Sequence, residues 1–256
     1  MREITLAEGF TVFGLSPDEA RFMYREIFED RCYLQKRVTL DDGDCVFDVG
    51  ANIGLATMFF HRARKNVRVF SFEPNPAAGE CLRANVEKHG VNASVFSCGL
   101  LDVSGTLPFT RYPANSVSSG FHADAAQDRA TTQSYMINTG IAEHGAEVFS
   151  AALFRKQETL ECPVRTLSEV IDEGGVERID LLKIDVERSE RQVLAGIRDY
   201  HWPRIRQLVM EFTDGVGGLN EVQEMLRTRG FTVTAEQEPL LRGTNLYNLY
   251  AVRERA

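Results

Sequence analysis

From about residue 44 onward, short apolar runs alternate with longer segments whose apolar positions recur every three or four residues. The apolar runs, which have the length of strands, lie at 45–49, 67–72, 94–98, 179–184, 208–212, 232–234 and 246–252. Helical periodicity covers 53–64, 77–89, 189–198 and 219–229. Strands that alternate with helices in this way predict an α/β fold, in which a parallel sheet lies between two layers of helices.

The first 40 residues have a different pattern. Residues 3–14 alternate loosely and predict a short β-hairpin. Residues 16–34 show helical spacing, with Ser16 as the N-cap and Glu19 completing a capping box. We interpret residues 1–40 as an N-terminal cap made of a hairpin and a helix.

The remainder, residues 41–256, is predicted to be a single main domain with one insertion. The stretch 111–161 is rich in Ser, Thr, Ala, Asn, Asp and Gln, and it contains one segment with helical character at 141–155. It is too long for an ordinary connection in a compact domain. We therefore expect it to be a lid or a substrate-binding loop.

Composition narrows the function classes. The chain has 29 Lys and Arg against 37 Asp and Glu, a net charge of −8, which argues against a nucleic acid as substrate. Its 5 cysteines form no C-x-x-C pair, so we expect neither a zinc site nor a disulfide framework, as is usual in a reducing cytoplasm. The N-terminus lacks a signal-peptide pattern, and no apolar stretch approaches the roughly 18 residues of a membrane span. We predict a cytoplasmic protein with no membrane partner.

The strongest local signal is CVFDVGANIGLATMFF at 45–60, where an apolar strand leads through a glycine turn into a helix. Gly50 permits the tight turn, and Gly54 permits close packing of the helix against a strand or a ligand. Glu73 follows the next strand, about 20 residues later, where an acid accepts hydrogen bonds from ribose hydroxyls. The alternative is a purely structural turn and helix cap.

The ligand of such a nucleoside-binding unit is either a dinucleotide or a smaller adenosyl compound. The dinucleotide fingerprint has a second glycine where this chain has Asn52. No G-K-[ST] segment follows, which excludes a P-loop. The pattern therefore favours an adenosine with a smaller anionic tail.

The segments FDVGANIGL, FSFEPNP, VRTLSEV, IDLLKIDVE and LVMEF occur in the order and spacing of the FkbM family, and the chain resembles these S-adenosylmethionine-dependent methyltransferases from about Cys45 onward. The resemblance implies a class I Rossmann-like methyltransferase fold, with a mostly parallel seven-stranded sheet whose last strand is antiparallel. The N-terminal part is similar to members embedded in, or beside, polyketide and peptide synthases.

Position by position, the resemblance also implies a set of cofactor contacts. The methionine end would be surrounded by Asp48, Gly50, Asn52 and Gly54, the ribose would be bound by Glu73, and the adenine would be flanked by Cys98 and Gly99. One position departs from the family pattern: Arg188 stands where glycine usually follows LKIDVE. It makes the local turn less permissive.

Three further acids end predicted strands. Asp185 and Glu187 end the fourth strand and Glu211 ends the fifth, at the edge of the sheet where ligands bind in open α/β folds. One of them is expected to act as a general base toward a hydroxyl. Alternatively, Asp185 and Glu211 bind a divalent cation such as Mg²⁺, or the acids only orient Lys183 and the nearby backbone.

Two histidines in the insertion, His122 and His144, are further candidates for the base, although most loop histidines are solvated. The sequence predicts O-methylation of a hydroxyl on a small molecule, or on an intermediate carried by an acyl carrier protein in natural-product synthesis. The alternatives are an NAD(P)-dependent oxidoreductase and a non-catalytic adenosyl-binding module. The sequence leaves the oligomeric state open.

Overall fold

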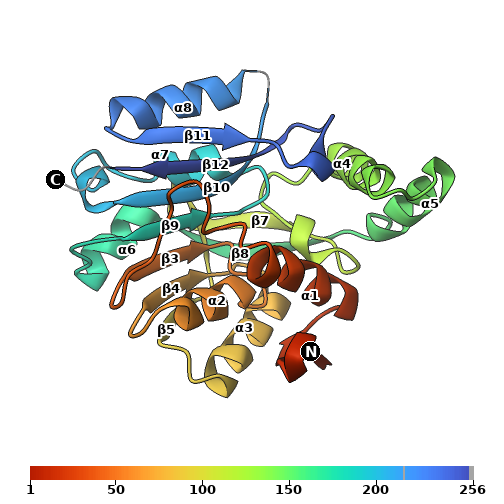
Figure 1. Cartoon of the computed structure of the whole chain (residues 1–256), viewed down its shortest axis with the longest axis horizontal. Helices are drawn as coiled ribbons and strands as arrows, with labels where there is room; N and C mark the ends of the chain where they lie inside the picture. The colour runs from red at the N-terminus through yellow and green to blue at the C-terminus, as the bar shows by residue number, and fades with distance from the viewer. Residues whose placement is uncertain (216, 254–256) are drawn as a thin grey trace.

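The computed structural model describes residues 1–215 and 217–253, which contain one central sheet and two smaller ones (Figure 1). In spatial order, the central seven-stranded sheet consists of β11 (Thr232–Glu236), β12 (Leu246–Val252), β10 (Gln207–Thr213), β9 (Leu181–Ile184), β3 (Cys45–Val49), β4 (Arg68–Phe72) and β5 (Ala93–Phe96). β12 is antiparallel to both of its neighbours, and the pairs from β10 to β5 are parallel. The predicted sheet, with its antiparallel last strand, is confirmed.

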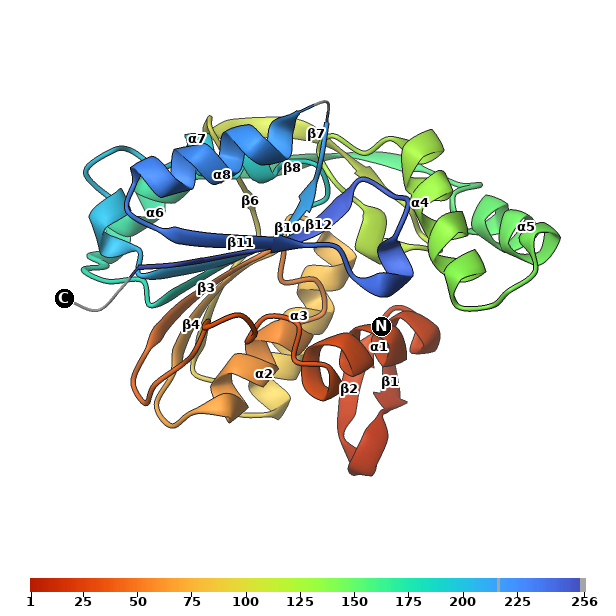
Figure 2. The same ribbon diagram turned by 45° about the horizontal axis from the view of Figure 1, so that its top comes forward.

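Helices cover both faces of this sheet. One face packs against α2 (Leu55–Ala63) and α3 (Pro76–Lys88), and the other against α6 (Leu167–Gly174), α7 (Glu190–Ala195) and α8 (Gly218–Thr228), as Figure 2 shows. Neighbouring strand residues alternate between two buried clusters. Because both faces are buried, the strands are apolar along their whole length, which is why they stand out in the sequence.

The predicted third strand, 94–98, ends earlier than expected. β5 stops at Phe96, and the chain then enters a second sheet in which β6 (Gly99–Leu101) pairs with β8 (Glu158–Thr166), and β8 pairs with β7 (Gly105–Arg111). A Cβ atom on Gly99 would lie 2.3 Å from the Phe121 ring, so the insertion packs directly on this crossing point. This small sheet was not predicted.

The insertion contains two helices, where the sequence predicted one. α5 (Glu143–Leu153) confirms the helix expected at 141–155, and α4 (Ala125–Asn138) precedes it. α4 begins at the N-cap Asp124, whose side chain accepts the backbone N–H groups of Ala126 and Gln127. The α4–α5 hairpin projects beyond the central sheet (Figure 2).

The N-terminal segment has the predicted hairpin, β1 (Arg2–Thr5) with β2 (Thr11–Gly14), followed by α1 (Pro17–Tyr24) and one π-helical turn, η2 (Arg25–Glu29). Only half of the expected capping box forms. Ser16 Oγ accepts the Glu19 N–H at 3.5 Å, but the Glu19 carboxylate turns away to Ser116 in the insertion. The Glu19 side chain therefore bonds to the insertion and does not cap the start of its own helix.

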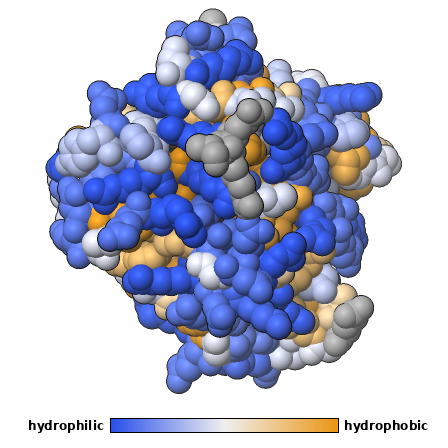
Figure 3. All heavy atoms as spheres, turned by 60° about the vertical axis from the view of Figure 1, so that its left-hand side comes forward, coloured by the Kyte–Doolittle hydropathy of each residue, from blue (hydrophilic) through white to orange (hydrophobic). Residues whose placement is uncertain are grey.

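The surface of the protein is mostly polar, as expected when the apolar side chains are buried on both faces of the sheet. The face seen in Figure 3 is mainly hydrophilic, and its apolar side chains are exposed only in scattered patches. No helix within the described ranges combines the length and apolar content needed to cross a bilayer.

Candidate functional site

A cavity of about 450 Å³ lies at the carboxyl ends of β3, β4, β9 and β10. Its other walls come from α1, η2, the 3₁₀ turn η3 (Ser116–Ser118), α4 and α5. The strand ends of the main sheet, the first 40 residues and the insertion thus meet around one space. This is where open α/β sheets bind their ligands.

The glycine turn after β3 forms the floor of this cavity. Gly50 has φ +80°, and a Cβ atom there would lie 1.8 Å from the Asp185 carbonyl oxygen, so no other residue fits. Asn52 is also left-handed, with φ +47°. Gly54 is the N-cap of α2, and a Cβ there would lie 2.6 Å from Leu82 Cδ1 of α3. Gly50 therefore brings β3 against β9, whereas Gly54 serves helix packing.

Glu73 follows β4 and lines the cavity with 7% exposure. Its Oε2 accepts the Asn52 N–H and its Oε1 accepts the Asn75 N–H, each at 2.8 Å. Burial raises its pKa to about 7, although these N–H donors oppose the shift. The cap of α3 is Asn75, not Glu73. Each Glu73 oxygen therefore accepts one backbone N–H and keeps one further lone pair for another donor.

Asp48 lies beneath the cavity rather than in its wall, because its side chain is fully buried. It accepts a hydrogen bond from Thr57 Oγ1 at 2.6 Å and pairs with Lys183 Nζ at 3.1 Å. Lys183 lines the cavity and donates to the Gly50 carbonyl at 2.7 Å. Burial disfavours its charge, but Asp48 and Asp185 outweigh that effect and raise its pKa. Asp48 therefore reaches the cavity only indirectly, through its ion pair with Lys183.

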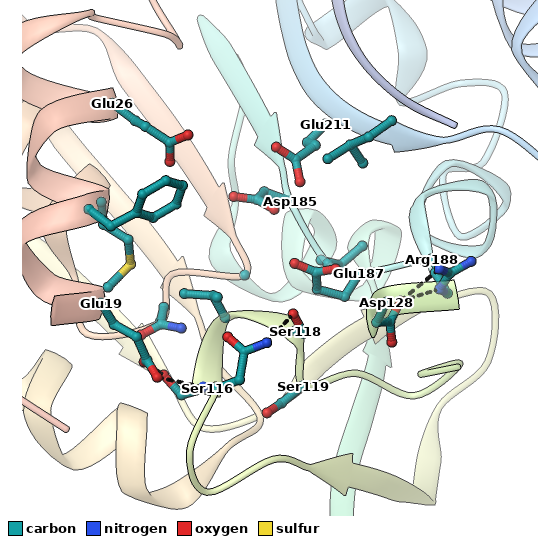
Figure 4. A pocket seen from close by; sticks show the side chains of 18 of the residues that line it. Glu19, Glu26, Ser116, Ser118, Ser119, Asp128, Asp185, Glu187, Arg188 and Glu211 are labelled. Carbon is teal, nitrogen blue, oxygen red and sulfur yellow. Dashed lines mark hydrogen bonds and ion pairs between the residues drawn. The ribbon is translucent and has the colours of Figure 1, made fainter. Parts of the chain in front are cut away.

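Three predicted acids meet at the cavity. Asp185, Glu187 and Glu211 each offer a carboxylate oxygen within 4.8 Å of the others (Figure 4). Tyr33 donates its hydroxyl hydrogen to Asp185 Oδ2 at 2.8 Å. Burial, together with the repulsion among these carboxylates, raises the pKa of both Glu187 and Glu211 well above the usual range. Such an arrangement either takes up a proton more readily than an ordinary carboxylate or offers oxygen ligands of the type that Mg²⁺ prefers.

Two residues of this cluster were not predicted from the sequence. Glu26, on the π-helical turn, points toward Asp185 and Glu211 in Figure 4, and burial raises its pKa to about 8. Tyr33 comes from the loop that follows the same turn. Both lie in the first 40 residues, where an acid or a tyrosine in a helical pattern carries no signal of a distant site.

Of the remaining predicted residues, some lie at the cavity and others lie away from it. Gly99 lines the cavity, whereas Cys98 is 5% exposed and belongs to the apolar core. His122 Nδ1 hydrogen-bonds to Ser189 Oγ at 3.0 Å, and Ser189, not His122, is part of the wall. The His144 side chain is 89% exposed on α5 and lies 3.9 Å from Glu147, so it is a surface residue.

The chain is similar in sequence to known methyltransferases, which agrees with a ligand site at the carboxyl ends of the strands. The family described as "Methyltransferase FkbM domain" matches residues 48–233. The chain is 46% identical over 250 residues to the 31-O-demethyl-FK506 methyltransferase FkbM of Streptomyces tacrolimicus, covering 98% of this chain and 96% of that protein. It is 38% identical to the AMB antimetabolite synthetase AmbE of Pseudomonas aeruginosa, covering 98% of this chain but 12% of that much longer protein.

A solved structure shares the fold. The crystal structure of methyltransferase FkbM from Methylobacillus flagellatus aligns with a TM-score of 0.53 and 16% identity, over 84% of this chain and 45% of the other. The glycine turn and Glu73 fall within the matched family region, as do the three carboxylates at the ends of β9 and β10. This chain belongs to the FkbM family of S-adenosylmethionine-dependent methyltransferases.

Proposed function

We propose that the protein transfers a methyl group to a hydroxyl oxygen of a small molecule or of a carrier-bound natural-product intermediate. The observation that carries the proposal is the cluster of Asp185, Glu187 and Glu211, whose carboxylate oxygens lie within 4.8 Å of one another in the wall of the cavity that Glu73 also lines. A hydroxyl nucleophile must lose its proton during the transfer, and a carboxylate with a raised pKa is suited to accept it. The name of one relative, a 31-O-demethyl-FK506 methyltransferase, supports an oxygen acceptor.

The donor set of the cavity fits S-adenosylmethionine. Glu73 offers acceptors for ribose hydroxyls, and Gly99 and Leu100 of β6 line the same cavity, where the adenine is expected to lie. Asp185 lines the same cavity and offers a carboxylate that suits a sulfonium and an ammonium group. When bound, this cofactor supplies an activated, electrophilic methyl group.

The residues of the chain then have three tasks. Tyr33 and Lys183 hold Asp185 in place through contacts of 2.8 and 3.6 Å. Glu211 or Glu187 accepts the proton of the acceptor hydroxyl. η3, held to α1 by Glu19 and Ser116, closes the cavity toward water, so that alignment and exclusion of solvent provide most of the acceleration.

A cation-assisted variant uses the same three carboxylates. Asp185, Glu187 and Glu211 would together hold Mg²⁺, which would lower the pKa of the acceptor hydroxyl directly. The two mechanisms differ in their response to a chelator. A non-catalytic module, in contrast, would bind the cofactor without turnover.

The test begins with calorimetric titration of S-adenosylmethionine, its demethylated product and NAD into the wild type and Glu73→Gln. Binding of the first two ligands, weakened about 10- to 100-fold in the variant by the loss of two charge-assisted acceptors, is the expected result. Glu80→Gln, on the exposed face of α3, is the matched control. Binding of NAD in preference to S-adenosylmethionine would overturn the assignment.

Turnover is then measured with methyl-labelled S-adenosylmethionine and paired acceptors. Each pair consists of a hydroxy acid and its amino analogue, offered free and as pantetheine thioesters. Label on oxygen supports the proposal, and preference for the thioester identifies the carrier-bound class. Label on nitrogen or carbon would contradict O-methylation.

A further inference from the structure

The loop after β9 contains two consecutive residues in the left-handed region. Glu187 has φ +52° and Arg188 has φ +71°, a conformation that L-residues rarely adopt. The arginine must therefore be held by contacts of its side chain.

Those contacts reach across to the insertion. The Arg188 Nε and Nη2 atoms lie 2.8 and 2.6 Å from Asp128 Oδ1 on α4 (Figure 4). Nη1 donates to Gln127 Oε1 at 2.8 Å. The side chains of Arg188 and Asp128 are 14% and 7% exposed, so the pair is largely shielded from solvent. Guanidinium is suited to such a site because several donors act in one plane.

Asp128 is itself fixed at the start of α4. Its second oxygen, Oδ2, accepts the N–H of the N-cap residue Asp124 at 3.1 Å. A second contact lies in the loop between η3 and α4: a Cβ atom on Gly120 would be only 2.9 Å from the Glu187 carbonyl oxygen. The insertion thus holds the turn at Glu187 and Arg188 from two sides.

We propose that Arg188 is a positioning residue, whose ion pair with Asp128 holds the strained turn and thereby directs the Glu187 carboxylate toward Asp185 and Glu211. The inference rests on the proposed function, because it gives Glu187 a place in the catalytic cluster. It adds that the insertion helps to assemble this cluster, so that placement of α4 over the cavity and correct aim of Glu187 occur together.

The informative variant is Arg188→Ala/Asp128→Asn. Alanine keeps the strain of the left-handed turn but lacks the side-chain contacts that hold it, and the second change avoids leaving a buried carboxylate without its partner. We expect the double variant to fold and to bind the demethylated cofactor product within about 3-fold of wild type. We expect kcat to fall about 10- to 100-fold, because a misplaced reacting group costs this much. Arg191→Ala, which removes an exposed ion pair with Glu221, is the control and should leave kcat unchanged.

The pH dependence separates positioning from general loosening. Glu187 faces Asp185, Glu211, Asp128, Glu190 and Arg188, and Glu211 also faces Glu26. If the turn relaxes, Glu187 leaves the other carboxylates, and the acidic limb of the kcat profile moves to lower pH. The double variant removes opposite charges together, so their direct effects on this limb largely cancel. Arg188→Lys, which keeps the charge but not the planar fork, should recover part of kcat.

A readout without turnover is carbon-13 NMR titration of glutamate carboxyl groups, in which Glu187→Gln identifies the signal. We expect the pKa of Glu187 to fall in the double variant. Wild-type kcat with an unmoved pH profile, or an unchanged Glu187 titration, would overturn the positioning role. A wild type that titrates as expected but transfers no methyl group would overturn the proposed function alone.

Discussion

The carboxylate of Glu73 accepts the backbone N–H of Asn52 at 2.8 Å, which ties the acid after β4 to the left-handed turn after β3. The two residues are distant in sequence, and each belongs to a different strand–helix unit. Their contact gives the turn one defined conformation next to the cavity. The turn itself is possible only because Gly50 approaches the backbone after β9 so closely.

Gly50→Ala is therefore expected to destabilise the fold severely. The added Cβ would lie 1.8 Å from the Asp185 carbonyl oxygen, which is backbone and cannot turn aside. We expect a loss of roughly 3–5 kcal/mol in the free energy of unfolding, the range of severe steric conflicts. Urea denaturation measures it. Gly43→Ala is the control, since Gly43 has φ +82° with no atom within 4 Å of the added Cβ, and it should cost only about 1 kcal/mol.

The patterns that could be recognised in the sequence are the local ones. β3 and β4 are buried on both faces, and the glycine turn and Glu73 belong to one continuous unit, so spacing alone located them. The acids at Asp185 and Glu211 followed from the ends of apolar strands.

What the sequence did not reveal depends on contacts between distant segments. α4 contains few apolar positions and is anchored by polar contacts, among them the Asp128–Arg188 pair. β8 pairs with β6 and β7 from a stretch that alternates too weakly to identify the partners. Glu26 lies on a π-helical turn and lines the cavity, and the spacing of apolar residues in the sequence does not indicate that turn.

Glu26→Gln should make the unliganded protein more stable at alkaline pH. Burial raises the Glu26 pKa from 4.5 to about 8, so the folded state binds more protons than the unfolded state between these values. Stability due to this group is present below pH 4.5 and is lost as pH rises toward about 8. At pH 8 or above, the neutral amide should gain roughly 1–3 kcal/mol. Thermal melts across this pH range test it. Glu29→Gln, exposed on the same turn, should leave the pH dependence unchanged.

Glu211→Gln and Glu187→Gln should both lower kcat while leaving binding of the demethylated product nearly unchanged. Loss of a general base costs about 10²- to 10⁴-fold in kcat, so the variant with the larger loss marks the residue that takes the proton.

If the carboxylates act as a base, treatment with a chelator leaves the wild-type rate unaltered. Loss of activity with EDTA, restored by Mg²⁺, would instead favour the cation-assisted mechanism. Initial rates with labelled cofactor decide between them.

Separating α1 from η3 should weaken acceptor binding without affecting the cofactor. Glu19 binds both the N–H and the hydroxyl of Ser116, and burial raises the Glu19 pKa despite these donors. Ser116→Ala removes the hydroxyl and leaves the carboxylate poorly satisfied, whereas Glu19→Gln in the same background relieves part of that cost. A double-mutant cycle should therefore give a coupling energy of about 1–2 kcal/mol in stability. KM for the acceptor should rise about 5- to 10-fold in Ser116→Ala, because η3 then encloses the acceptor less tightly and about 1 kcal/mol of binding free energy is lost. Arg21→Ala, whose side chain is 60% exposed on the same helix and does not line the cavity, should change neither quantity. Equal KM values for Ser116→Ala and wild type would show that η3 does not enclose the acceptor.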